Sequence, residues 1–256
     1  MISLQYDCRK DAPVGRLNKL QQKITTCKKC PRLVKYLNEI KKQLDVKTPQ
    51  RGVSSWCKPV PSFGDPNAEI LIVGLAPGRF GSNRTGRMFT GDSSGNFMYK
   101  ILYETGLCNK PTATDINDGL VLKNCYITAM GRCAPPQNKP TPKELSNCFS
   151  YFEEEIKLLK KIKVVVALGK IAFDGYLKWL SVRADQVGAD QSVCTFRKKD
   201  FTFSHGAIYS SKDLPHTLIA SYHPSRQNTQ TGRLTVKMFR EIFEKAKESC
   251  QTSMKM

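Results

Sequence analysis

The sequence predicts an α/β fold, a three-layer sandwich in which a central, mainly parallel four-stranded sheet is flanked by helices. Short β-branched apolar runs recur along the chain, the clearest at residues 69–75 (EILIVGL), 124–130 (NCYITAM) and 163–168 (KVVVAL). Continuous apolar runs of this length are typical of strands buried on both faces of a parallel sheet. Segments with helical periodicity separate the runs, and strand–helix–strand alternation indicates helices on both sides of such a sheet.

The first elements are two helices over residues 14–44, broken at Pro31. Apolar residues fall on one face of each: Leu17, Leu20 and Ile24 in the first, and Leu33, Val34, Leu37, Ile40 and Leu44 in the second. Cys27 and Cys30 lie at the junction between them. Residues 45–67 are polar and contain several prolines, so we expect a loop there.

The first buried strand leads into a glycine-rich segment, residues 76–95, and a helix is predicted over 96–106 with Gly106 as its terminator. After the strand at 124–130, residues 141–144 (TPKE) supply an N-cap, a proline at the first helical position and the Glu of a capping box. Apolar residues then recur at helical spacing: Leu145, Cys148, Phe149, Phe152, Ile156 and Leu159. Cys148 is therefore expected on the buried face of this helix.

The last part of the chain continues the alternation. A helix is predicted from Gly169 to Leu180, strands over 201–209 and 217–222, and an amphipathic helix from Arg233 to Glu248. Residues 181–199 look irregular and are interpreted as an insertion. The length of 256 residues fits a single domain, 1–256, to which the N-terminal helices belong.

The composition narrows the class of protein. Lys and Arg number 41 against 22 Asp and Glu, a net charge of +19, and 40% of residues are hydrophobic, enough for a substantial core. The N-terminus lacks the apolar stretch of a signal peptide, and no apolar run approaches the ~20 residues of a membrane span. We expect an intracellular protein with a polyanionic partner, nucleic acid first. The alternative is a basic surface that serves only solubility.

Ten cysteines in such a chain need an explanation. Because reducing cytosol disfavours disulfides, clustered cysteines there more often bind metal or take part in redox chemistry. A disulfide between two of them stays open as an alternative, since intracellular proteins of hyperthermophiles are an exception to this rule.

The carboxyl ends of parallel strands meet at one edge of a sheet, and ligands bind there. The segment Gly74–Asp92 (GLAPGRFGSNRTGRMFTGD) follows the first strand and contains five glycines, which allow a backbone to approach a ligand closely. It matches neither GxxxxGK[ST] nor GxGxxG, which disfavours nucleoside triphosphate and dinucleotide sites. Its arginines, Arg79, Arg84 and Arg87, can pair with phosphates, and Phe89 can stack on a base. Asp92 is suited to act as a base or to position water. The alternative is a structural loop, with Phe89 in the core and Asp92 capping the next helix.

The segment Ser221–Leu234 (SYHPSRQNTQTGRL) follows the last strand of the predicted sheet. His223 opens this polar loop and can exchange a proton or a hydrogen bond with a ligand at the sheet edge. His205 falls inside a predicted strand and His216 just before one, so neither opens such a loop. A purely structural, hydrogen-bonded role for His223 is the alternative.

Together these motifs resemble the uracil-DNA glycosylase superfamily, and more narrowly its type-5 branch of iron–sulfur enzymes. The matching strings, in family order over residues 25–245, are CKKCPRL (27–33), GDPNAEILIVGLAPG (64–78), NRTGRMFTGD (83–92), RCAPPQNKPTPKE (132–144), ALGKIAF (167–173) and SYHPSRQNTQTGRL (221–234). The resemblance implies a uracil-DNA glycosylase-like domain that hydrolyses the N-glycosidic bond of a damaged base in DNA.

For the cysteines, the resemblance implies a [4Fe–4S] cluster held by Cys27, Cys30, Cys133 and Cys148. The spacing, a Cys-x-x-Cys followed by two further cysteines, suits four thiolates on either an iron–sulfur cluster or Zn²⁺. The family favours iron–sulfur, in a structural role. The other six cysteines are treated as structural.

The resemblance also assigns the reaction residues. Asp92 would position or activate water, His223 would stabilise the departing base, and Asn138 would position water or backbone. The base pocket would comprise Ala76, Pro77, Gly78, Phe89 and Ala129. The DNA contacts would comprise Arg84, Arg87, Ser225, Arg226, Gln227 and Asn228, with the +19 charge binding phosphates.

One departure matters for specificity. The type-4 branch resembles YITN where this chain has Tyr126-Ile127-Thr128-Ala129, and it carries an acidic residue where this chain has Leu75. The loss of both polar groups predicts a less base-specific pocket that takes uracil, hypoxanthine and other deaminated bases.

Two other classes remain as alternatives: a non-catalytic iron–sulfur module that only binds DNA, and a structural zinc protein. The expected partners are double- or single-stranded DNA with damaged bases, and a sliding clamp. We expect a monomer without membrane contact, in the cytoplasm of a prokaryote, a thermophilic archaeon, and associated with its nucleoid.

Overall fold

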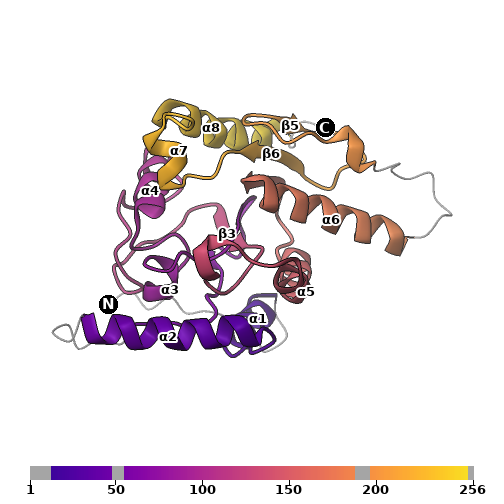
Figure 1. Cartoon of the computed structure of the whole chain (residues 1–256). Coiled ribbons are helices and arrows are strands. Elements are labelled where there is room, and N and C mark those ends of the chain that lie inside the picture. Colours follow the sequence, from indigo (N-terminus) through magenta and orange to yellow (C-terminus); the bar gives the residue numbers. More distant parts are fainter. Residues whose placement is uncertain (1–12, 48–54, 188–196, 253–256) are drawn as a thin grey trace.

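A computed structural model describes residues 13–47, 55–187 and 197–252 and shows three layers, with helices on both faces of one sheet (Figure 1). Four five-residue strands form the parallel centre: β2 (Ile70–Gly74), β3 (Cys125–Ala129), β4 (Val164–Leu168) and β6 (Thr217–Ser221). They lie in the order β3-β2-β4-β6, and the register pairs Ile72 with both Ile127 and Val166. The predicted α/β fold with a parallel core of four strands is confirmed.

The sheet has six strands, two more than predicted. β1 (Phe63–Gly64) pairs antiparallel with β3 at one edge, and β5 (Ile208–Tyr209) pairs antiparallel with β6 at the other. Strands of two residues are too short to leave a periodic pattern in a sequence. The strand predicted over 201–209 is too long, because only its last two residues pair, and His205 lies in the turn before them.

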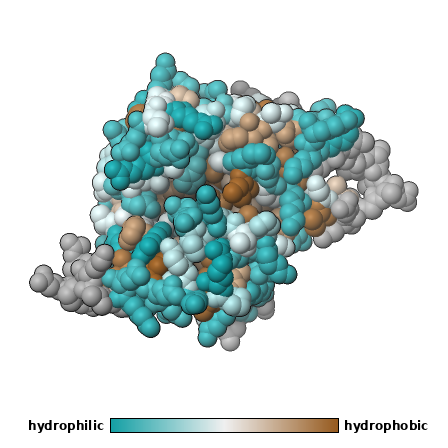
Figure 2. Space-filling view, viewed as in Figure 1, coloured by the Kyte–Doolittle hydropathy of each residue, from teal (hydrophilic) through white to brown (hydrophobic). Residues whose placement is uncertain are grey.

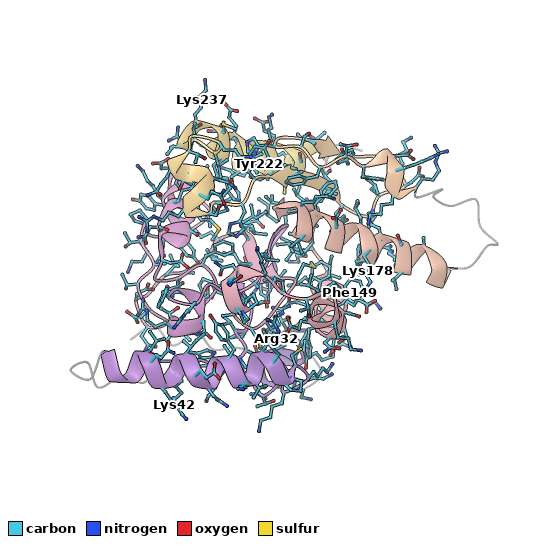
Figure 3. The ribbon with its side chains drawn as sticks, in the orientation of Figure 1. Arg32, Lys42, Phe149, Lys178, Tyr222 and Lys237 are labelled. Carbon is cyan, nitrogen blue, oxygen red and sulfur yellow. The ribbon has the colours of Figure 1, made fainter. Side chains whose placement is uncertain are left out.

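Helices cover the sheet unequally. α4 (Ser93–Glu104) and α8 (Val236–Thr252) pack on one face, where Phe239 and Phe243 are fully buried. α1 (Pro13–Thr25), α5 (Pro142–Leu158) and α6 (Lys170–Val187) cover the other. Lys178 of α6 lies over the ring of Phe149 from α5 at 4.4 Å, which joins two helices of this layer (Figure 3).

α2 (Pro31–Lys47) follows α1 after the predicted break at Pro31, and its buried Ile40 and Leu44 pack on Cys57. At the start of α5, Thr141 accepts a hydrogen bond from the Glu144 N–H while the Glu144 carboxylate accepts one from the Thr141 N–H, so the predicted capping box is confirmed.

Three helical boundaries differ from the prediction. α6 continues seven residues past Leu180 to Val187, so the predicted insertion begins inside a helix, and residues 188–196 lie outside the described ranges. α4 begins at Ser93 because Asp92 caps it. A one-turn helix, α7 (Arg226–Gln230), forms within the histidine loop, and α8 starts after it.

The face of the molecule in Figure 2 is mainly hydrophilic, with hydrophobic residues gathered near its middle. Lys42 and Lys237 project from opposite ends of the molecule (Figure 3), as expected for a high positive charge spread over the surface. None of the helices in the described ranges has the length and apolar character needed to cross a membrane.

Candidate active site and cysteine centre

The two predicted loops meet at the carboxyl edge of the sheet. Phe89 of the glycine-rich loop (Gly74–Asp92) and His223 of the histidine loop (Ser221–Leu234) stack with ring centroids 5.7 Å apart. Gly74 and Gly169, at the ends of β2 and β4, leave the space for these rings. A Cβ on Gly74 would lie 3.1 Å from the Phe89 ring, and one on Gly169 would lie 3.5 Å from the His223 Cβ.

Phe89 belongs to both the core and the site. It is 8% exposed and packs in the core cluster under α4, yet its ring faces His223. Its backbone has a φ of +53°, which is uncommon for a bulky residue. The Phe89 N–H donates to Ser82 Oγ at 2.8 Å and helps to hold this conformation. Phe89 therefore lies in the core, as the structural alternative predicted. Its ring can still contact a ligand beside His223.

Asp92 caps α4 with one carboxylate oxygen and leaves the other toward the loop. Its Oδ1 accepts the Gly95 N–H at 2.9 Å, as the structural alternative predicted. Oδ2 lies where a side chain on Gly81 would have to be, and a Cβ on Gly78 would lie 2.9 Å from it. The missing side chains of the two glycines thus leave room for the carboxylate. Because only Oδ1 caps the helix, Oδ2 can still interact with a ligand.

A buried ion pair ties the glycine-rich loop to a distant part of the chain. Arg87 Nη2 lies 2.6 Å from Asp118 Oδ2, and the two side chains are 3% and 6% exposed. Although burial acts to raise the pKa of Asp118, hydrogen bonds from Arg87 and from the backbone N–H groups of Leu120 and Thr114 hold that pKa far below its usual range. The guanidinium of Arg87, predicted to contact DNA, is therefore buried in this structure and committed to the pair with Asp118.

Arg84 braces the same loop. Its Nε donates to the Phe80 carbonyl at 2.9 Å and Nη2 donates to the Gly91 carbonyl at 3.3 Å. The side chain is half-buried. Arg84 therefore uses two of its N–H groups to hold the loop. Only the rest of its guanidinium is left for the predicted contact with DNA.

His223 is half-buried, and burial lowers its pKa to about 4. A histidine with that pKa is neutral at pH 7. The neutral ring can donate one hydrogen bond, so it can stabilise negative charge that develops on a ligand without first taking up a proton.

The histidine loop is held mostly by its own residues. Asn228 Nδ2 donates to the His223 carbonyl at 2.8 Å, and the Ser225 N–H donates to the same carbonyl at 2.7 Å. Ser225 Oγ caps α7 by accepting the Asn228 N–H. Ser225 and Asn228, predicted as DNA contacts, thus hold the loop, whereas Arg226 and Gln227 are exposed at the start of α7.

The remaining predicted site residues lie at the same edge with different exposure. Ala129 ends β3 and is 1% exposed, and Pro77 is buried between the half-buried Ala76 and Gly78. Two backbone hydrogen bonds, from Met130 N to the Gly74 carbonyl and from Gly131 N to the Leu75 carbonyl, join the segments after β2 and β3.

Asn138 lies four residues before the start of α5. It ends a short 3₁₀ helix, η2 (Pro136–Asn138), with a φ of +57°, and its side chain is exposed. Within the described part of the chain, no hydrogen bond joins its amide to Asp92 or His223. The structure therefore stacks Phe89 on His223 and holds Asp92 in the same loop as Phe89, whereas no hydrogen bond among the described residues ties Asn138 to Asp92 or His223.

The four predicted cysteine ligands border one cavity. Cys27 and Cys30, between α1 and α2, face Cys133, after β3, and Cys148 of α5. Burial, then the nearby Cys148, Cys27 and Cys30, raise the pKa of Cys133, so bare thiolates repel each other there. A cationic centre is what would keep all four as thiolates, so the donor set fits a thiolate-ligated group. Among the described residues, however, the side chains form no preassembled set of three or more ligands for a metal ion.

Polar groups surround these cysteines. Asn147 Nδ2 donates to Cys30 Sγ at 3.3 Å. Arg132, next to Cys133, is 1% exposed and lies 2.7 Å from the equally buried Glu155. Of the other cysteines, Cys57, Cys108, Cys125 and Cys250 are buried thiols, which agrees with structural roles, and Cys8 and Cys194 lie outside the described residues.

Sequence reasoning missed three residues that shape the site. Phe80, in the glycine-rich loop, is 60% exposed and has the Arg79 guanidinium 4.9 Å from its ring centroid. Asp118 has no motif around it. His205 accepts the Tyr222 N–H through Nδ1 at 3.1 Å and stacks on the Tyr222 ring at 5.1 Å, so it holds the residue before His223. For Phe80, the sequence offers one signal, an aromatic residue between an arginine and a glycine. For the other two, only the fold brings the contacts together.

Comparison with known proteins agrees with this fold. The family model of the uracil DNA glycosylase superfamily matches residues 61–247, which include both loops and all four central strands. The chain therefore belongs to the uracil-DNA glycosylase superfamily.

The relatives identify the branch. A protein named type-5 uracil-DNA glycosylase from Thermus thermophilus is 48% identical over 226 residues, which cover 88% of this chain and 94% of that protein. Proteins of the same name from Pyrobaculum aerophilum and Mycobacterium leprae are 39% and 40% identical, over 93% and 91% of this chain and 95% and 96% of their own lengths. Within the superfamily, this chain is of the type-5 branch.

Proposed function

We propose that this protein is a monofunctional DNA glycosylase that excises uracil and leaves an abasic site. The observation that carries the proposal is the stack of Phe89 on the neutral His223 at the carboxyl edge of the sheet, on a loop that also holds the Asp92 carboxylate. The names of the relatives, all uracil-DNA glycosylases, support the same activity.

The reaction suits these groups. Water adds to C1′ of the sugar, the C1′–N bond breaks, and the base leaves as an anion that then takes up a proton. The transition state has positive charge on the sugar and negative charge on the base. Asp92 Oδ2 would position the water and offset the positive charge, while the His223 N–H would donate to a base carbonyl. Phe89 would pack against the base.

The base must leave the duplex to reach this pocket, at a cost of a few kcal/mol. We propose that the +19 charge supplies sequence-independent phosphate binding for this step, with Arg226 and Gln227 as exposed contacts. Phe80 extends the proposal, because an exposed aromatic ring beside the loop that holds Asp92 can stack on a base next to the extruded one.

The proposed base pocket has few polar side chains that could distinguish one base from another. Ala129 has no polar group at the end of β3, and Leu75 precedes Ala76 at the end of β2. We therefore propose that hypoxanthine and other deaminated bases are also excised. Comparable single-turnover rates on uracil and hypoxanthine, within about tenfold, would support this, whereas strict uracil specificity would contradict it.

We also propose that Cys27, Cys30, Cys133 and Cys148 hold a [4Fe–4S] cluster. Bound there, the cluster would join the junction of α1 and α2 to the segment after β3 and to α5, as a structural clamp. Purified protein should be brown, with broad visible absorbance and about four iron atoms per chain. A colourless protein with one zinc would establish the zinc alternative.

Substitutions at three residues test the catalytic assignment: the protein is incubated with a uracil-containing duplex, and alkali then cleaves the abasic sites. Asp92→Asn keeps an oxygen that can cap α4 but removes the charge, so stability should change by less than about 1 kcal/mol. The single-turnover rate should fall by roughly 10²–10⁴-fold. Asp92→Ala loses both cap and charge, which separates the two roles.

His223→Ala should slow the same step by roughly 10²-fold or more, because it removes a hydrogen bond to the developing anion. Asn138→Ala should cost only about tenfold, since its side chain is exposed and none of the hydrogen bonds among the described residues ties it to Asp92 or His223. If none of the three slows cleavage, the catalytic assignment fails. Salt-sensitive DNA binding by wild-type protein with no abasic product would favour the non-catalytic DNA-binding module.

A further inference from the structure

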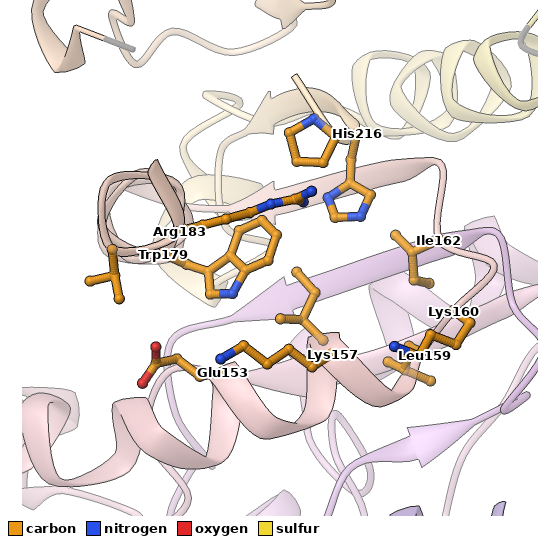
Figure 4. A pocket seen from close by; sticks show the side chains of 11 residues that line it. Glu153, Lys157, Leu159, Lys160, Ile162, Trp179, Arg183 and His216 are labelled. Carbon is orange, nitrogen blue, oxygen red and sulfur yellow. The ribbon is translucent and has the colours of Figure 1, made fainter. Parts of the chain in front are cut away.

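A second cavity lies at the opposite edge of the sheet from the proposed active site. It has a volume of about 520 Å³ and is bordered by the end of α5, by α6 and by the segment before β6 (Figure 4). Ile162 precedes β4 and His216 precedes β6, whereas the active-site loops follow the other ends of the strands. A five-residue strand spans about 17 Å, so the two sites are separate.

The charged residues around this cavity are mostly cationic. Lys157 lies in the last turn of α5, Lys160 two residues beyond its end and Arg183 in α6, against the single carboxylate of Glu153. Within the ranges that the structure describes, none of these three cations forms an ion pair. All three are exposed enough to move toward a ligand. The cavity is therefore complementary in charge to an anion.

The cavity also has an aromatic wall with N–H groups. Trp179 is 4% exposed and stacks on His216 with ring centroids 5.6 Å apart, while Arg183 lies 5.6 Å from the Trp179 ring (Figure 4). His216 Nδ1 is 2.9 Å from the Tyr176 hydroxyl. No hydrogen bond from another described residue uses the second ring nitrogen of His216 or the indole N–H of Trp179, so both remain for a ligand.

Burial, then the charge of Arg183, lower the pKa of His216 to about 4, so its ring is neutral at pH 7. The neutral ring can donate or accept one hydrogen bond, according to its tautomer. Ile156, Ile162 and Pro215 supply apolar surface on the remaining walls. Cations at the mouth, hydrogen-bonding ring edges and apolar walls together suit a ligand with a charged end and a flat, partly polar body.

We propose that this cavity binds a planar anion of nucleotide size, with a phosphate between Lys157, Lys160 and Arg183 and an aromatic ring toward Trp179 and His216. The volume falls in the ordinary range of small-molecule sites, about 300–1,000 Å³. The proposal concerns a site apart from the glycosylase pocket and does not depend on the proposed function.

Tryptophan fluorescence gives a direct test, because the chain has two tryptophans and one of them lines the cavity. In a Trp56→Phe background, excitation at long wavelength reports Trp179 alone. The probes are adenosine monophosphate, adenosine and inorganic phosphate, titrated at fixed ionic strength. We expect saturable quenching by the monophosphate, with adenosine and phosphate each at least tenfold weaker.

Substitutions of the cations and of the carboxylate at the cavity should change the affinity for the monophosphate in opposite directions. Lys157→Ala with Arg183→Ala should weaken monophosphate binding at least tenfold, whereas Glu153→Gln should strengthen it about threefold. Lys42→Ala, an exposed lysine on α2, is the control and should leave binding unchanged. Absence of saturable quenching at millimolar monophosphate, equal binding of adenosine or phosphate, or wild-type affinity in the double variant would each overturn the proposal.

Discussion

The two loops that face each other across the proposed active site are held by different kinds of contact. The glycine-rich loop depends on residues far away in sequence, since Arg87 pairs with Asp118, 31 positions away, and Arg79 Nη2 donates to Gln43 of α2, 36 positions away. The histidine loop is braced mainly from within, by Ser225 and Asn228, which bond the His223 carbonyl two and five positions along the chain.

This difference follows from what each loop must do. The glycine-rich loop gives up side chains at Gly78 and Gly81 so that the Asp92 carboxylate fits. Besides the internal bonds of Arg84 and Ser82, it takes support from outside through Arg87 and Arg79. The histidine loop carries polar residues that cap α7 and so supplies its own support. Remote substitutions should therefore disturb the Asp92 side of the pocket more than the His223 side.

The largest effect is expected from Asp118→Asn. Loss of the carboxylate leaves Arg87, which is 3% exposed, buried without its charge partner, and such losses cost roughly 3–5 kcal/mol of folding free energy. Urea unfolding measures this cost. Asp174→Asn removes the partner of Lys170 in an exposed i,i+4 pair, so it should cost only about 0.5 kcal/mol. Equal costs for the two variants would show that the buried pair does not hold the loop.

Gly81→Ala should have the next largest effect, and mainly on activity. The new methyl group would collide with Asp92 Oδ2 and displace the carboxylate, so we expect a rate loss approaching that of Asp92→Asn, about 10²-fold or more.

The control for this substitution is Gly106→Ala, which also adds a methyl group. That group meets no atom within 4 Å, although the φ of +76° strains the backbone. Gly106→Ala should lower stability by about 1 kcal/mol without slowing catalysis. A fully active Gly81→Ala enzyme would rule out the glycine-rich loop as the support of Asp92.

The sequence predicted the parts of this comparison that depend on local patterns. The four buried strands, the break at Pro31 and the capping box at Thr141 each leave a signal within a few residues, and all three are confirmed. Both loops were placed at one sheet edge from strand order alone. The two-residue edge strands and the one-turn α7 were missed because a single turn or pair has no period.

The contacts that hold the loops were harder to predict. Arg87 was assigned to DNA because an arginine in a basic loop ordinarily faces solvent, and nothing near Asp118 in sequence indicates a buried partner. Asp92 was given two alternatives, cap or catalytic group, and the structure shows that its two oxygens allow both. Such assignments depend on three-dimensional neighbours, which a single sequence does not supply.

A smaller effect is expected from Asn228→Ala in the histidine loop. The variant loses the hydrogen bond to the His223 carbonyl, so the free energy of unfolding should fall by only about 1 kcal/mol and the single-turnover rate by at most about fivefold. Gln230→Ala, at the exposed end of α7, should match wild type in both measurements. A loss of stability as large as that of Asp118→Asn would mean that both loops depend on the fold to the same extent.

The smallest effect distinguishes the loops by pH. Because burial lowers the pKa of His223 from 6.5 to about 4, an opened loop binds a proton that the closed loop excludes. The closed form therefore loses stability as the pH falls from 6.5 toward 4, and between pH 7 and 6 the loss is about 0.7 kcal/mol. Amide hydrogen exchange, corrected for its intrinsic pH dependence, should show roughly threefold weaker protection at Asn228 over this step.

The pKa of Asp118 lies far below this range, so protection of the Leu120 N–H should not change. In His223→Gln the pH effect at Asn228 should vanish. If it persists, another group must control the opening of the histidine loop.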